Sequence, residues 1–258
     1  MEATKAFLGV EPLEHGALWD VVFGGTKGNI LDLALIEQWI ALFEKARTSP
    51  DLRAVRIRGE GAHFSFGASV HEHLPGEVTK MLPRFHQLFR SMVDSGVVCL
   101  AVVRGNCLGG GLELVSFCHR VFASPDARLG QPEIVLGVFA PIASMLLSER
   151  IGRANAEDLC LSGRIVASDE ALRMGLVDAL SQDPEAAALH YAREHLLHRS
   201  ASSLRYAVKA ARFGVRARLD EELRALERVY LDELMETEDA VEGLKAFIEK
   251  RPPQWRNA

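Results

Sequence analysis

The sequence predicts an α/β fold with a helical region at its C-terminal end, and two patterns support this. Over the first two thirds of the chain, short runs rich in β-branched residues alternate with segments of helical periodicity, which is typical of an α/β domain. From Pro184 onward the periodicity is helical and the helix faces are charged. We therefore expect a core over residues 1–183 and a helical region over residues 184–258.

Three segments predict strands, and one predicts the first long helix. We expect strands over residues 17–23, 54–58 and 97–103. The last of these is apolar on both faces, as a strand buried inside a sheet should be. Between the first two, apolar residues recur near helical spacing over residues 33–47, and Asp32 precedes them as a candidate N-cap.

A glycine-rich turn over residues 104–113 separates the third strand from a second predicted helix. The turn reads Arg-Gly-Asn-Cys-Leu-Gly-Gly-Gly-Leu-Glu, so Glu113 falls in the first helical turn. A helix start carries unpaired N–H groups and partial positive charge, and glycine lets a ligand oxygen approach the backbone closely. Such a site could stabilise negative charge on an acyl oxygen. Taken alone, a tight structural turn explains the glycines better, because they match neither GxGxxG nor GxSxG.

Two further segments stand before and after this turn. Residues 64–70 read Phe-Ser-Phe-Gly-Ala-Ser-Val, and residues 129–133 read Leu-Gly-Gln-Pro-Glu. Together the three segments resemble the enoyl-CoA hydratase (crotonase) superfamily, and the resemblance covers nearly the whole chain. It implies a crotonase-like spiral of ββα units, capped by a C-terminal helical trimerisation region, and assembly as a homotrimer or homohexamer.

The resemblance assigns roles to four residues. It implies that the backbone N–H groups of Ala68 and Gly110 form an oxyanion hole for a thioester oxygen, and that Glu113 and Glu133 are catalytic carboxylates. We assign Glu113 mainly to water activation and Glu133 mainly to proton delivery. An acidic residue at a helix start and a surface residue after a proline turn are the ordinary explanations for these glutamates. Their joint occurrence beside both oxyanion segments favours catalysis.

The segment after Glu133 departs from the common hydratase pattern. Residues 134–144 read Ile-Val-Leu-Gly-Val-Phe-Ala-Pro-Ile-Ala-Ser, where ordinary hydratases continue into a glycine-rich loop. Pro141 has no N–H, whereas the resemblance implies that a glycine at this place can hold the catalytic water through its backbone. Phe139 and Pro141, with Phe66 of the first segment, predict an apolar acyl pocket suited to a compact or cyclic acyl group.

The same strings are similar to the branch of cyclohexa-1,5-diene-1-carbonyl-CoA hydratases, which act in anaerobic aromatic degradation, the benzoyl-CoA pathway. The similarity implies hydration of a conjugated cyclic dienoyl thioester to 6-hydroxycyclohex-1-ene-1-carbonyl-CoA. Water would attack the β carbon, and a proton would reach the far end of the diene. A short-chain enoyl-CoA hydratase, an enoyl-CoA isomerase and a non-catalytic acyl-CoA-binding subunit are the alternatives.

The last predicted helix, within residues 237–251, is similar to the last helix of the family. The resemblance implies that Phe247 and Lys250 bind the CoA nucleotide. An apolar packing contact and a cation favoured by the helix dipole explain these two residues as well. His71 stands where the family often has a lysine, which implies a weaker cationic contact to the CoA phosphates.

Composition and charge exclude several classes of partner. The chain has 258 residues, 48% of them hydrophobic, and a formal net charge of −5. This acidic balance argues against nucleic acid as a partner, because phosphate binding needs a concentrated basic face. No stretch reaches the ~20 apolar residues of a membrane span, and residues 1–5 do not begin a leader pattern. We therefore expect a cytoplasmic enzyme without a membrane partner.

No metal or redox cofactor is expected. The four cysteines show no CxxC spacing. His71 and His73 flank Glu72, but no third ligand cluster is evident, so a solvated helix face explains the triplet better than a metal site. Water addition to a polarised thioester transfers no net electrons, and CoA is part of the acyl-CoA substrate.

Overall fold

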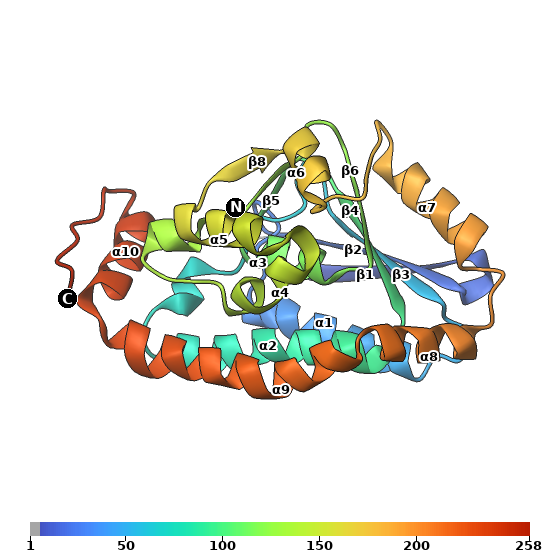
Figure 1. The fold of residues 1–258 in the computed structure, drawn as a ribbon, viewed down its shortest axis with the longest axis horizontal. Coiled ribbons are helices and arrows are strands. Elements are labelled where there is room, and N and C mark those ends of the chain that lie inside the picture. Colours follow the sequence, from blue (N-terminus) through green and yellow to red (C-terminus); the bar gives the residue numbers. More distant parts are fainter. Residues whose placement is uncertain (1–5) are drawn as a thin grey trace.

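A six-stranded sheet and a three-stranded sheet form the centre of the computed structural model, which describes residues 6–258 (Figure 1). The larger sheet has the order β1-β2-β3-β4-β6-β9, in which β1 runs antiparallel to β2 and the other neighbours are parallel. The smaller sheet has the order β5-β7-β8. Residues 1–5, on which part of the expectation about a leader rests, lie outside the described range.

The strands have the following bounds: β1 Phe7–Leu13, β2 Leu18–Gly24, β3 Ala54–Gly59, β4 Val98–Val103, β5 Asn106–Leu108, β6 Arg120–Ala123, β7 Arg128–Gly130, β8 Ile165–Ala167 and β9 Ala179–Leu180. Strands β2, β3 and β4 confirm the three predicted strands to within one residue at each end. All six residues of β4 are buried, because helices cover both faces of a parallel sheet.

The helices have the following bounds: α1 Leu33–Arg47, α2 Val78–Ser95, α3 Gly110–Phe117, α4 Pro141–Ile151, α5 Arg153–Ser162, α6 Ser168–Met174, α7 Pro184–His195, α8 Ala201–Ala211, α9 Phe213–Arg228 and α10 Glu238–Glu249. Helix α1 confirms the predicted helix and its cap, since Oδ1 of Asp32 accepts a hydrogen bond from the N–H of Leu35 at 2.8 Å. This bond satisfies one of the free donors at the helix start.

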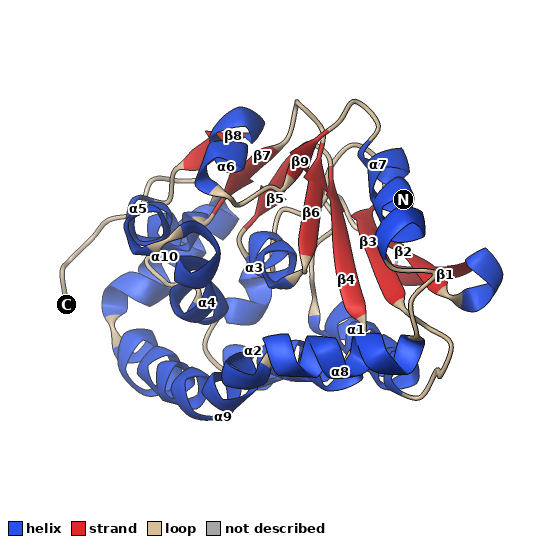
Figure 2. Cartoon of the chain, turned by 45° about the vertical axis from the view of Figure 1, so that its right-hand side comes forward, coloured by secondary structure: helices blue, strands red, loops and turns tan. Residues whose placement is uncertain are grey.

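Helices pack on both faces of the larger sheet (Figure 2). On one face, Leu100 and Val102 of β4 pack with Ala188 of α7 and Val208 of α8. On the other, alternate strand residues join the main core with α1, α2 and α3. The alternation follows from the strand geometry, because successive side chains point to opposite faces of a sheet.

The chain passes alternately from one sheet to the other. The glycine turn lies at one of these passages, between β4 and α3. The chain passes from β4 in the larger sheet to β5 in the smaller sheet and then into α3, and it repeats the step from β6 to β7. These are the repeated ββα turns that the resemblance predicted. The loop after β3 forms isolated bridges from Ser65 to Cys107 and from Ala68 to Leu31. The first predicted segment therefore lies against the glycine turn.

The described chain contains no strand after β9, so the prediction of a helical region from Pro184 is confirmed. Helix α9 lies alongside α2 in both views (Figures 1 and 2). A π-helical turn, Val229–Glu233, follows α9, and α10 then packs against the 3-10 turns Val70–His73 and Pro132–Leu136. None of the helices within residues 6–258 is long and apolar enough to cross a membrane.

Candidate active site

The loop after β3 and the start of α3 each direct one free backbone N–H into the same small space. These are the N–H groups of Ala68 and Gly110. The N–H of Leu31 bonds the carbonyl of Gly67 at 3.0 Å, and the N–H of Ser69 bonds the carbonyl of Leu31 at 3.3 Å. In a parallel pairing of this kind, the N–H of the residue between them, Ala68, points away from Leu31. A Cβ atom placed on Gly110 would lie 3.2 Å from the Ala68 nitrogen, so both donors border the same small space.

Neither N–H has a backbone acceptor within residues 6–258. Gly110 is the first residue of α3, and the N–H groups of a first helical turn have no partner inside the helix. Both donors are thus available to a ligand oxygen, and the partial positive charge of the helix start adds to their field.

Glycine is required at the turn for conformation and for space. Gly67 has φ of +104° and Gly109 has φ of +53°, a region that L side chains rarely occupy. A Cβ atom on Gly109 would also lie 2.6 Å from Oε1 of Glu133. The turn therefore lets a carboxylate approach the backbone next to the two donors.

Glu113 lies in the first turn of α3 with only 3% of its surface exposed. Its Oε1 accepts a hydrogen bond from the N–H of Ala143 at 3.0 Å, at the start of α4. Burial, and then the nearby negative charge of Glu133, raise the pKa of Glu113 well above its usual range.

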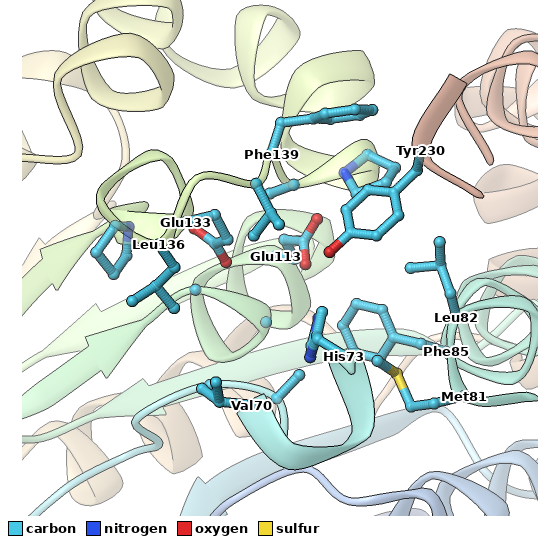
Figure 3. A pocket seen from close by; sticks show the side chains of 18 of the residues that line it. Val70, His73, Met81, Leu82, Phe85, Glu113, Glu133, Leu136, Phe139 and Tyr230 are labelled. Carbon is cyan, nitrogen blue, oxygen red and sulfur yellow. The ribbon is translucent and has the colours of Figure 1, made fainter. Parts of the chain in front are cut away.

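Glu133 lies in the 3-10 turn Pro132–Leu136 that follows β7. Its Oε1 accepts a hydrogen bond from Nε2 of Gln131 at 3.0 Å, whereas its buried Oε2 has no partner in the described part of the chain. Burial raises the pKa of Glu133 well above its usual range. Figure 3 shows both glutamates directed into one cavity. Because both pKa values are raised, the pair can provide a base and an acid near neutral pH.

The two glutamates and the two N–H donors border a cavity with mainly apolar walls. Its lining includes all seven residues that sequence reasoning placed in the oxyanion hole, the carboxylate pair and the acyl pocket: Phe66, Ala68, Gly110, Glu113, Glu133, Phe139 and Pro141. Phe247 and Lys250 do not line it. Phe247 is 57% exposed on α10, and Lys250 is the residue at which α10 ends.

His73 and Tyr230 also line the cavity, and sequence reasoning missed both. The expectation that His73 belongs to a solvated helix face is wrong: burial lowers its pKa, and its Nδ1 bonds the carbonyl of Ser69 at 2.8 Å. The turn Val70–His73 is a short 3-10 helix whose last residue faces inward. Tyr230 lies far away in the sequence, and the packing of its turn with residues of α2 and α10 brings it to the cavity.

No group of three His, Cys, Asp or Glu side chains that could hold a metal is found among residues 6–258. Glu72 of the suspected triplet instead accepts a hydrogen bond from the N–H of Leu33 at 2.9 Å. It therefore contacts the start of α1.

Comparison with known proteins identifies related sequences. The family model described as enoyl-CoA hydratase/isomerase matches residues 24–258. Cyclohexa-1,5-dienecarbonyl-CoA hydratase of Thauera aromatica is 51% identical over 242 residues, which are 94% of this chain and 94% of the relative. A probable enoyl-CoA hydratase of Bacillus subtilis is 33% identical over 88% of this chain and 91% of its own.

Solved structures share the same fold. An enoyl-CoA hydratase/isomerase from Pseudoalteromonas atlantica superimposes with a TM-score of 0.84 at 23% identity, covering 97% of this chain and 99% of the other. An enoyl-CoA hydratase from Mycobacterium avium subsp. paratuberculosis gives a TM-score of 0.81 at 25% identity, with 97% and 98% covered. The spiral expected from the sequence is therefore the fold of this chain.

Proposed function

Because this chain belongs to the enoyl-CoA hydratase/isomerase family, we propose that it is a hydro-lyase acting on a conjugated cyclic dienoyl-CoA thioester. The reaction is the hydration of cyclohexa-1,5-diene-1-carbonyl-CoA to 6-hydroxycyclohex-1-ene-1-carbonyl-CoA. The observation that carries the substrate is the 51% identity, over 94% of both chains, to the hydratase of that name. No group besides the substrate's own CoA is needed.

The site geometry supports an addition through an enolate. The N–H groups of Ala68 and Gly110 would bind the thioester oxygen and stabilise the negative charge that develops on it. Glu113 takes a proton from water while the C–O bond forms at the β carbon, and the electron pair moves into the dienolate. Glu133 then delivers a proton to the far end of the diene as the conjugated enoyl thioester re-forms. One proton is taken up and one is delivered, so the reaction balances.

The walls of the cavity support a compact ring as the acyl group. Phe66, Phe139 and Pro141 border it together with Phe85 and Met81 from α2. These apolar side chains offer few partners to a polar acyl chain, and they would exclude bulk water from the charged intermediate.

Three further features belong to this proposal as implications of the family resemblance. Phe247 and Lys250 would contact the CoA nucleotide from the exposed end of α10. The chain would assemble as a homotrimer or homohexamer. It would act in the cytoplasm, within anaerobic aromatic degradation.

A direct comparison of hydration rates tests the substrate. We expect kcat/KM for cyclohexa-1,5-diene-1-carbonyl-CoA to exceed that for crotonyl-CoA. The apolar walls favour a ring, and the second double bond of the diene delocalises the negative charge of the intermediate. Mass spectrometry identifies the hydrated products. A preference for crotonyl-CoA would make this protein an ordinary short-chain hydratase. Double-bond migration without a gain of water would make it an isomerase, and inactivity on both would make it an acyl-CoA-binding subunit.

A further inference from the structure

The hydroxyl of Tyr230 lies in the wall of the cavity without a hydrogen-bond partner in the described chain. Tyr230 is only 1% exposed, and Figure 3 shows its oxygen directed toward Glu113. Its ring packs against Phe139, with 5.3 Å between the ring centroids. The residue lies in the π-helical turn after α9, a feature that is frequent at functional sites. Buried hydroxyl groups normally have partners, so this one is placed to bind a ligand atom.

The backbone donors at the start of α4 are missing, bonded or directed to Glu113. Pro141 has no N–H. The N–H of Ala143 bonds Oε1 of Glu113 at 3.0 Å, the N–H of Ile142 is directed to the same carboxylate, and the N–H of Ser144 bonds the carbonyl of Ala140 at 2.9 Å. A water beside Glu113 must therefore find its hydrogen-bond donor elsewhere in the cavity.

Among the side chains of the cavity, His73 cannot supply this donor. His73 uses Nδ1 on the Ser69 carbonyl, and its lowered pKa keeps the ring neutral, so Nε2 is an acceptor. Tyr230 carries the one side-chain hydroxyl among the described residues that line the cavity. Burial, and then the charges of Glu133 and Glu113, raise the pKa of Tyr230. The phenol therefore keeps its proton and can donate it in a hydrogen bond.

We propose that Tyr230 is a further catalytic residue, whose hydroxyl donates a hydrogen bond to the water that adds to the ring and then to the new hydroxyl of the product. The water oxygen lies between Tyr230 and Glu113. One O–H bond of this water breaks toward Glu113 while the C–O bond forms at the β carbon, and Tyr230 keeps its own proton throughout. The inference rests on the proposed hydration.

Tyr230→Phe tests the inference, because it removes the hydroxyl and keeps the ring. We expect kcat for the diene to fall about tenfold or more with a small change in KM. We also expect the affinity for 6-hydroxycyclohex-1-ene-1-carbonyl-CoA to fall about tenfold, and the affinity for cyclohexanecarbonyl-CoA, which has no ring hydroxyl, to stay the same. The thermal midpoint should not fall, since the hydroxyl has no partner in the described chain.

Tyr206→Phe is the matched control, because Tyr206 is 74% exposed on α8; this variant should behave as the wild type. Equal losses of affinity for both thioesters in Tyr230→Phe would show a packing role and overturn the inference, as would an unchanged kcat. Failure of the wild type to hydrate the diene would instead contradict the proposed function. In that case the two affinities still show whether Tyr230 contacts the ring hydroxyl.

Discussion

Glu133→Gln is expected to slow hydration of the dienoyl thioester by about 10³-fold while thioester binding stays nearly unchanged. The amide has the shape of the carboxyl group but neither delivers nor accepts a proton near neutral pH. Its oxygen can still accept the hydrogen bond that Nε2 of Gln131 now donates to Oε1 at 3.0 Å. Single-turnover rates, together with the affinity for a saturated thioester, separate the chemical step from binding.

Loss of fold would not explain this result. The folded-state pKa of Glu133 is raised above its unfolded value, so ionisation of the carboxyl disfavours the folded state at neutral and higher pH. The amide removes this cost, and the thermal midpoint at pH 8 should not decrease. Glu222→Gln, at an exposed position on α9, is the control with unchanged activity. Turnover of Glu133→Gln at the wild-type rate would remove Glu133 from the mechanism.

Gly110→Ala is expected to lower kcat/KM by about 10² to 10³-fold, because a thioester oxygen kept away from the Gly110 N–H loses as much as when one oxyanion donor is removed. The added Cβ would lie 3.2 Å from the Ala68 nitrogen and 3.2 Å from the ring of Phe85. It would therefore occupy space that the thioester oxygen needs between the two N–H groups. Steady-state kinetics on the diene measure the loss of catalysis, and a thermal melt shows whether the fold tolerates the alanine.

The backbone of α3 should tolerate this alanine. Gly110 is helical and does not have the positive φ of Gly109, and alanine is the better helix former. Gly214→Ala is the control, because a Cβ there meets no atom within 4 Å near the start of α9; it should leave activity unchanged. Wild-type kcat/KM in Gly110→Ala would show that the thioester oxygen does not bind between these donors.

Local sequence patterns predicted the elements that carry their own signals. The cap at Asp32, the apolar β4 strand and the helix beginning at Pro184 all lie where periodicity and turn residues indicated. Short β5, which pairs with β7 in the second sheet, was not predicted. The three residues of β5 are too few to show a periodicity, and their pairing depends on how the chain passes between the two sheets.

The candidate site shows the same division. Ala68, Gly110, Glu113 and Glu133 could be predicted because three motifs occur together in the sequence, and the structure brings them to one cavity. Tyr230 could not be predicted, because nothing near it in the sequence distinguishes an inward-facing tyrosine from a packing residue. For His73 the polar neighbours indicated the solvent, and only the packing of its turn against the cavity reverses that prediction.

Turnover of the wild-type protein in ²H₂O tests the central claim most directly. Incubation with cyclohexa-1,5-diene-1-carbonyl-CoA should give a product with a hydroxyl on the former β carbon and one solvent deuterium on the opposite ring carbon, as read by NMR. This pattern requires water attack and proton delivery at the two ends of the diene. Deuterium on the carbon that bears the thioester, or deuterium without a new hydroxyl, would contradict the proposed hydration.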